Sequence, residues 1–156
     1  MESKLIEKIN QNYIGILNIL KEFLKDNFNV IKENNKNFNS FENNILSKKS
    51  NEIEKYINEY TNENNKLLEK INKVKINVDE LINEIKSNKN QIIENSNESL
   101  YLVKHPKDCL FLLQIDNYNN NIYNYFNLIY SQINTHKYDK LESIYFILTN
   151  MKISSK

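Results

Sequence analysis

The sequence predicts an all-α, elongated fold in which a long coiled-coil helix is followed by two shorter helices. Most positions at alternating spacings of three and four residues from Leu46 to Ile92 are apolar, which is the pattern of a coiled-coil helix. Residues 4–31 and 107–134 have the broader apolar spacing of amphipathic helices. The chain contains one Gly and one Pro, too few for the turns of an all-β fold.

We call the positions at this three-and-four spacing the seam. Eleven of its fourteen positions are apolar, against four of the other 33 residues in the stretch. A helix of this length is roughly 70 Å long, which exceeds the width of a compact domain of this size. Because one such helix alone in water is marginal, the seam must be covered by other chains or by a long, rod-like hairpin.

The seam also indicates what kind of partner would cover it. β-branched residues dominate one half of the repeat, as at Ile57 and Ile71, and this segregation favours parallel association. Leu68 and Ile82 widen the apolar face, which favours two neighbouring helices over one and therefore a three-stranded bundle. The predicted partner interface consists of Phe41, Leu46, Ile53, Ile57, Tyr60, Leu67, Ile71, Val74, Val78, Leu81, Ile85 and Ile92.

The first element is predicted to be one long coiled-coil helix over residues 4–94. Its apolar pattern thins between Lys32 and Asn37, where the sequence reads KENNKN. Neither Pro nor Gly stops the helix there, so we expect a weak point near Asn35 rather than a loop.

The rest of the chain is predicted to contain a joint and two helices. Residues 95–106 form the joint, because Ser and Asn cluster there and Pro106 cannot continue a preceding helix. A second helix covers 107–134. Asp139 is a suitable N-cap for a third, short helix over 139–153.

Composition argues against several classes of partner. The 21 Lys and 20 acidic residues give a net charge of +1 and are scattered evenly, and there is no Arg, so direct nucleic-acid binding is not expected. No apolar run is longer than that from Cys109 to Leu113, which is far below the ~18 residues that span a bilayer. The N-terminus has no signal-peptide core, and the single Cys fits a reducing compartment. We therefore expect a cytoplasmic or nuclear protein without membrane insertion.

No group of residues predicts catalysis, a metal site or a cofactor. His105 and Cys109 are four residues apart, but no further ligand completes a site, so a structural role is expected for both. Asn64 and Asn88 in the seam could fix the register of a coiled coil. Asn accounts for 31 of the 156 residues, so their presence in the seam is expected from composition alone. The sequence does not predict an enzyme.

Three local strings resemble the central-channel FG nucleoporins, the sixty-two-kilodalton nucleoporin family of the nuclear pore. Residues 37–42, NFNSFE, are similar to the Asn-Ser/Ala-Trp-Asp signature of its first coiled coil, with Phe41 in place of Trp. Residues 112–116 are similar to an Ile-Asp element of its second helix. Residues 139–151 resemble the start of its third coiled coil, where Ile-Leu-Asn recurs.

The resemblance implies a structural coiled-coil subunit that joins two different coiled-coil nucleoporins in a heterotrimer and supports nucleocytoplasmic transport at the nuclear envelope. The chain has no Phe-Gly dipeptide, so the repeats that bind transport factors would come from elsewhere. The alternatives are a subunit of a membrane-traffic tether or SNARE-like bundle, a kinetochore or cytoskeletal linker, and a self-contained helical bundle without an obligate partner.

Overall fold

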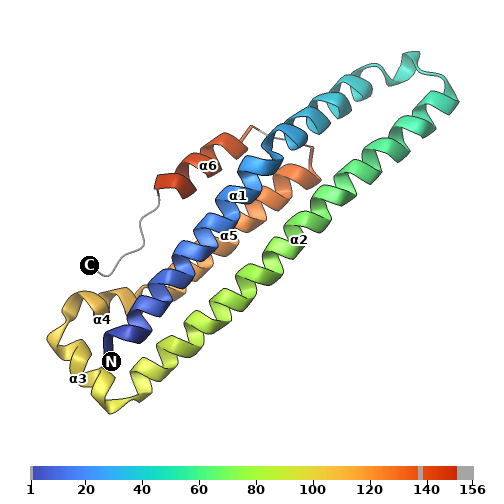
Figure 1. Cartoon of the computed structure of the whole chain (residues 1–156). Coiled ribbons are helices and arrows are strands. Elements are labelled where there is room, and N and C mark those ends of the chain that lie inside the picture. Colours follow the sequence, from blue (N-terminus) through green and yellow to red (C-terminus); the bar gives the residue numbers. More distant parts are fainter. Residues whose placement is uncertain (1, 137–138, 151–156) are drawn as a thin grey trace.

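The computed structural model describes residues 2–136 and 139–150, which are helical apart from short connections and contain no strand. Two long helices form a hairpin, and four shorter helices follow (Figure 1). The helices are α1 (Glu2–Asn43), α2 (Ser50–Glu94), α3 (Ser96–Lys104), α4 (Pro106–Leu113), α5 (Ile115–Asn134) and α6 (Leu141–Asn150). The predicted all-α, elongated fold is confirmed.

The chain reverses direction at residues 44–49, which corrects the prediction of one helix over 4–94. Asn35, the expected weak point, lies inside α1 and is only 1% exposed. At the turn, Asn44 Nδ2 donates to the Ser40 carbonyl (2.8 Å) and Ser47 Oγ donates to the Asn44 carbonyl (2.7 Å). Such local bonds compete with helix continuation. The reversal also lets α1 and α2 bury their apolar stripes against each other.

Contacts along the hairpin show that α1 and α2 are antiparallel. Near the turn, the Phe41 ring stacks on Tyr56 with centroids 3.9 Å apart. Toward the other end of the hairpin, Lys8 Nζ lies 3.3 Å from Glu84 Oε1. Residue numbers therefore fall along α1 while they rise along α2.

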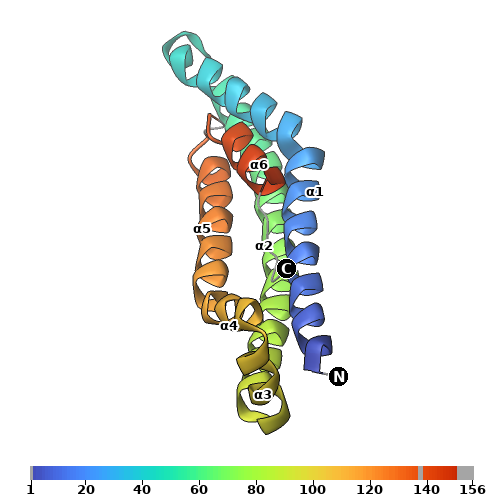
Figure 2. The ribbon, with the colours of Figure 1, turned by 90° about the vertical axis from the view of Figure 1, so that its left-hand side faces the viewer.

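On one side of the hairpin, helix α5 packs against α2 and helix α6 packs against α1 (Figure 2). The Tyr13 hydroxyl of α1 donates to Asn119 Oδ1 of α5 at 2.6 Å. The Tyr123 hydroxyl of α5 donates to Asp79 Oδ1 of α2 at 2.9 Å, and burial together with this carboxylate raises the pKa of Tyr123 to about 12. The hairpin and the two helices α5 and α6 thus pack together within one chain, and both α1 and α5 run antiparallel to α2.

The C-terminal half is more helical than predicted. The expected joint at 95–106 contains α3, and the expected helix at 107–134 is divided into α4 and α5 at Gln114. Leu113 before the bend is exposed, whereas Ile115 after it is buried. The bend therefore turns a different side of the helix toward the core. Pro106 opens α4, where its missing N–H costs nothing. Of the third predicted helix, residues 141–150 are helical and 151–153 lie outside the described residues.

Candidate protein-docking groove

Most of the predicted interface is covered by the chain itself. Five residues of the seam are at most 2% exposed, because α1 and α5 pack over them. These are Leu67, Ile71, Val78, Ile85 and Ile92. Val74 and Leu81 are half-buried against the same core. The sequence left open whether a hairpin or other chains cover the seam. From Leu67 to Ile92 the structure shows that the chain itself covers it.

The remaining predicted residues lie toward the tip of the hairpin, where α1 and α2 project beyond the end of α5 (Figures 1 and 2). We call residues 36–65 the distal arm. Phe41 is buried there, Ile53 and Tyr60 are half-buried, and Ile57 and Leu46 are 49% and 100% exposed. The uncovered part of the seam is therefore confined to the distal arm.

Five rings hold the distal arm together and join it to the end of α5. Besides the Phe41–Tyr56 stack, the Phe38 ring lies 4.9 Å from Tyr60, and the His136 imidazole lies 4.1 Å from Phe38, centroid to centroid. Each aromatic pair contributes about 0.5–1.5 kcal/mol beyond its buried area. The sequence prediction missed Phe38, Tyr56 and His136. The helical spacing of Phe38 with Phe41 and of Tyr56 with Tyr60 was the signal that could have found the first two.

These rings line an open groove of about 240 Å³ between α1 and α2. The aromatic side chains and Ile57 form most of its wall, and His136 closes the end nearest α5. On the side of His136 nearer the chain termini, α5 and α6 pack on the hairpin, and in the distal arm the groove is open to solvent. A largely apolar groove between two packed helices is suited to an amphipathic helix.

Several buried polar atoms around the groove have no hydrogen-bond partner among the described residues. They include the hydroxyls of Tyr56 and Tyr60 and Nδ1 of His136. An unpaired buried polar group costs about 1–3 kcal/mol. A bound polar group that paired with these atoms would remove that cost, so the groove can accept a partner with both apolar and hydrogen-bonding side chains.

Burial lowers the pKa of His136 from 6.5, and the nearby Glu42 carboxylate acts in the opposite direction. As pH falls through 6.5, the unfolded chain takes up a proton before the folded chain does, so the folded state loses stability. We expect the urea midpoint to fall between pH 7.5 and pH 5, and His136→Asn to reduce this fall. Asn tolerates the positive φ of 60° at this position. An equal pH dependence in both proteins would contradict the assignment.

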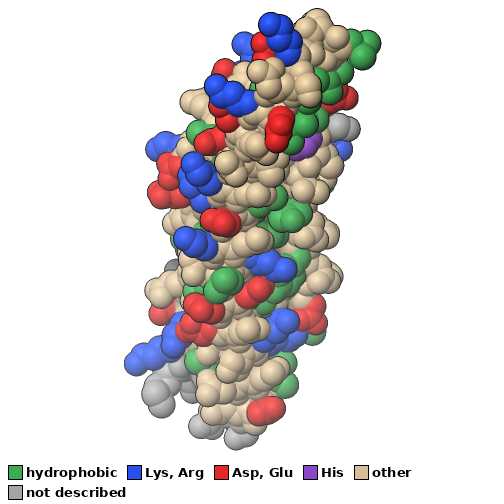
Figure 3. Space-filling model, turned by 90° about the vertical axis from the view of Figure 1, so that its right-hand side faces the viewer, with side chains coloured by type: hydrophobic (Ala, Val, Ile, Leu, Met, Phe, Trp, Pro, Cys, Tyr) green, Lys and Arg blue, Asp and Glu red, His purple; other side chains and the backbone are tan. Residues whose placement is uncertain are grey.

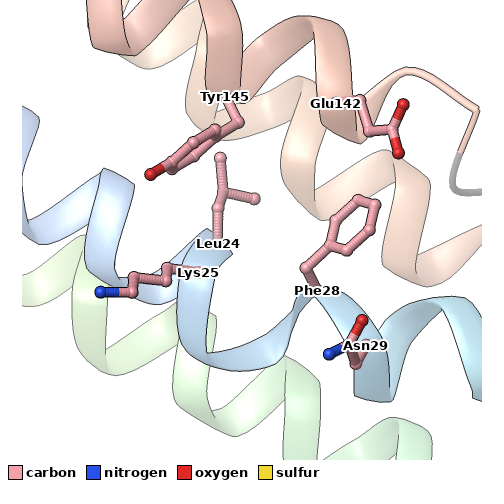
Figure 4. Close-up of a pocket in the computed structure, with 6 residues that line it drawn as sticks. All are labelled: Leu24, Lys25, Phe28, Asn29, Glu142 and Tyr145. Carbon is pink, nitrogen blue, oxygen red and sulfur yellow. The ribbon is translucent and has the colours of Figure 1, made fainter.

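A second groove, of about 270 Å³, lies between α1 and α6 (Figure 4). Leu24 and Phe28 of α1 and Tyr145 of α6 supply its apolar wall, with Lys25 and Glu142 at its edges. Although this space is larger, it is a crevice between two helices that already pack on each other. The groove in the distal arm, in contrast, lies on the part of the hairpin that projects beyond the end of α5 (Figures 1 and 2).

Nothing among residues 2–136 and 139–150 forms a group of three His, Cys, Asp or Glu side chains that could hold a metal. His105 stacks on Tyr101 at 3.8 Å, and Cys109 is a half-buried free thiol on the next turn. Asn64 and Asn88 are both buried. The visible face in Figure 3 carries Lys and acidic side chains interspersed with hydrophobic ones.

In the part of the chain that the structure describes, no helix combines the length and apolar character needed to cross a membrane. Comparison with known proteins adds no assignment, since no family model, curated protein or solved structure matches the chain.

Proposed function

We propose that this chain is a structural subunit that binds an amphipathic helix of another protein in the groove of its distal arm. The observation that carries the proposal is the open, largely apolar groove between α1 and α2 in the distal arm, which begins beside His136, just after the end of α5. A partner helix placed there would extend the line of α5 and complete a three-helix bundle along the arm. Helices that dock in this way use apolar residues at i, i+3, i+4 and i+7.

The groove also restricts the chemistry of the partner. Ile57 and the rings of Phe38 and Phe41 require apolar side chains opposite them. The unpaired hydroxyls of Tyr56 and Tyr60 favour a partner residue that can both donate and accept, such as Asn or Gln. Buried seam residues from Leu67 onward take no part, because α1 and α5 would have to leave before a partner could reach them.

The resemblance to central-channel nucleoporins supplies a specific form of the proposal. In this form, two coiled-coil nucleoporins provide the partner helices, and the chain supports nucleocytoplasmic transport at the nuclear envelope. One of the three strings that carry the resemblance, residues 37–42, includes Phe38 and Phe41 of the groove wall. A membrane-traffic tether or a kinetochore or cytoskeletal complex would use the same groove, and the identity of the bound helix separates these cases.

Ile57→Asp should abolish partner binding while leaving the chain folded. Ile57 is half exposed, so a carboxylate there costs little in the free chain but would be buried without a partner in the complex. We expect a loss of at least about 30-fold in affinity, which corresponds to the 2 kcal/mol or more of a central interface residue. Ile76→Asp is the matched control, because Ile76 is 58% exposed on the same helix but lies outside the groove.

The partner can be found with a photoreactive phenylalanine analogue at position 57 of the full chain, with position 76 as control. The proposal predicts a covalent product that is specific to position 57 and that maps to an amphipathic helix of the partner. Affinity for that helix is then measured with both Asp variants. Equal binding by Ile57→Asp and the unmodified chain would overturn the proposal.

A further inference from the structure

The connection between α1 and α2 is almost helical already. Asn44 has φ −116° and ψ 14°, and Ile45–Ser47 form a short 3₁₀ helix. Only Lys48 (φ −90°, ψ 146°) and Lys49 (φ −75°, ψ 154°) are extended. No residue of the turn has a positive φ, and the turn contains neither Gly nor Pro. Rotation of the backbone at two lysines, which are good helix formers, together with adjustment at Asn44, would join α1 and α2 into one helix.

The closed turn is also weakly secured. Leu46 is 100% exposed and Ile45 is 39% exposed, so the turn leaves two large apolar side chains in solvent. Helix α2 begins after Lys49, whose side chain cannot accept a hydrogen bond as an N-cap should. The one bond at this position that involves a side chain, from the Lys49 amide to Glu52 Oε2, is long at 3.4 Å. A continuous helix would need no cap here.

The apolar stripes of the two helices adjoin at this turn. Ile31 and Phe38 of α1 and Ile45 of the turn follow one another at seven-residue intervals. Leu46 of the turn and Ile53 and Tyr60 of α2 have the same spacing. In one continuous helix the two stripes would meet, shifted by one residue, at Ile45 and Leu46. The exposed pair would then lie on the side of the helix that faces its neighbour.

We propose that the hairpin opens at Lys48 and Lys49 and that two copies of the chain exchange α1 to form a domain-swapped dimer. In the dimer, α1 of each copy packs on α2 of the other, so contacts such as Phe41–Tyr56 and Lys8–Glu84 are reproduced between chains. The partner is a second copy because only an identical chain supplies this whole set of contacts. The two hinges meet at the centre, where Ile45 and Leu46 of both copies become buried. The dimer carries two docking grooves and is bivalent.

Lys49→Pro tests the proposal, because proline fits the closed turn but not the open helix. The φ of −75° at Lys49 suits proline, and the extended Lys48 is allowed before it. In a continuous helix the same proline would remove a hydrogen bond and clash with the preceding turn. We expect the dimer fraction after refolding at high micromolar concentration to fall at least about tenfold, with unchanged stability of the monomer. The double variant Asn44→Ala and Ser47→Ala, which removes the side-chain hydrogen bonds of the turn, should raise the dimer fraction.

Exchange is detected by mixing one chain that carries Lys8→Cys with another that carries Glu84→Cys, both with Cys109→Ser. After joint refolding, a short bis-maleimide should link the two different chains, since the swap places position 8 of one copy beside position 84 of the other. Absence of this product at high concentration would overturn the proposal. Equal amounts of the cross-linked product in the Lys49→Pro background would also overturn the proposal, because the dimer would then not depend on the hinge.

Discussion

Ile71→Asp should unfold the isolated chain, whereas Ile76→Asp should leave it folded. The two positions carry the same residue on the same helix, but Ile71 is fully buried and Ile76 is 58% exposed. Asp at position 71 loses the packing of an Ile side chain and places a carboxyl group in an apolar core. The expected loss is more than about 4 kcal/mol, which is comparable with the whole stability of many domains.

Thermal unfolding followed by circular dichroism measures this difference, with the purified chain at low micromolar concentration. The comparison separates two explanations of the seam. If the seam were an interface for other chains, Ile71→Asp would alter partner binding but not the folding of the single chain. An Ile71→Asp protein as stable and helical as the Ile76→Asp protein would therefore contradict cover within the chain.

Most of the helical structure was predictable because the helices other than α3 carry periodic apolar stripes that local sequence encodes. The seam from Leu46 to Ile92 predicted α2, and Pro106 predicted the start of α4. What covers a stripe is not a local property. The same spacing suits a rod that assembles with other chains and a hairpin that folds on itself, and the sequence left both open.

The position of the turn between α1 and α2 could not be predicted either. Asn44 and Ser47 form the hydrogen bonds at the reversal of the chain. Asn is so frequent in this sequence that Asn44 could not be recognised as a turn residue. KENNKN looked weaker because it has no apolar residue, yet Asn35 within it is buried in the hairpin. A turn without Gly or Pro carries little sequence signal.

The groove was predictable only in part. Ile57 and Tyr60 were expected at an interface because they belong to the seam, and both line the groove. No pattern in the sequence pointed to His136. Its contact with Phe38 and Tyr60 depends on the length of α5, which carries it to the base of the distal arm. Such long-range contacts follow from how the helices pack, and no nearby residues encode them.

The distance between positions 8 and 84 tests most directly that the long helical region folds back on itself. Lys8→Cys and Glu84→Cys, in a Cys109→Ser background, provide sites for two spin labels in one chain. The unmodified side chains approach within 3.3 Å, so pulsed electron paramagnetic resonance on the dilute monomer should give a distance on the order of 20 Å, from an interhelical spacing of about 10 Å plus the labels. In one continuous helix, the 76 residues between the labels would separate them by about 110 Å. The hairpin predicts the short distance. A dilute monomer that shows only the long distance would contradict the hairpin fold, and with it the docking groove.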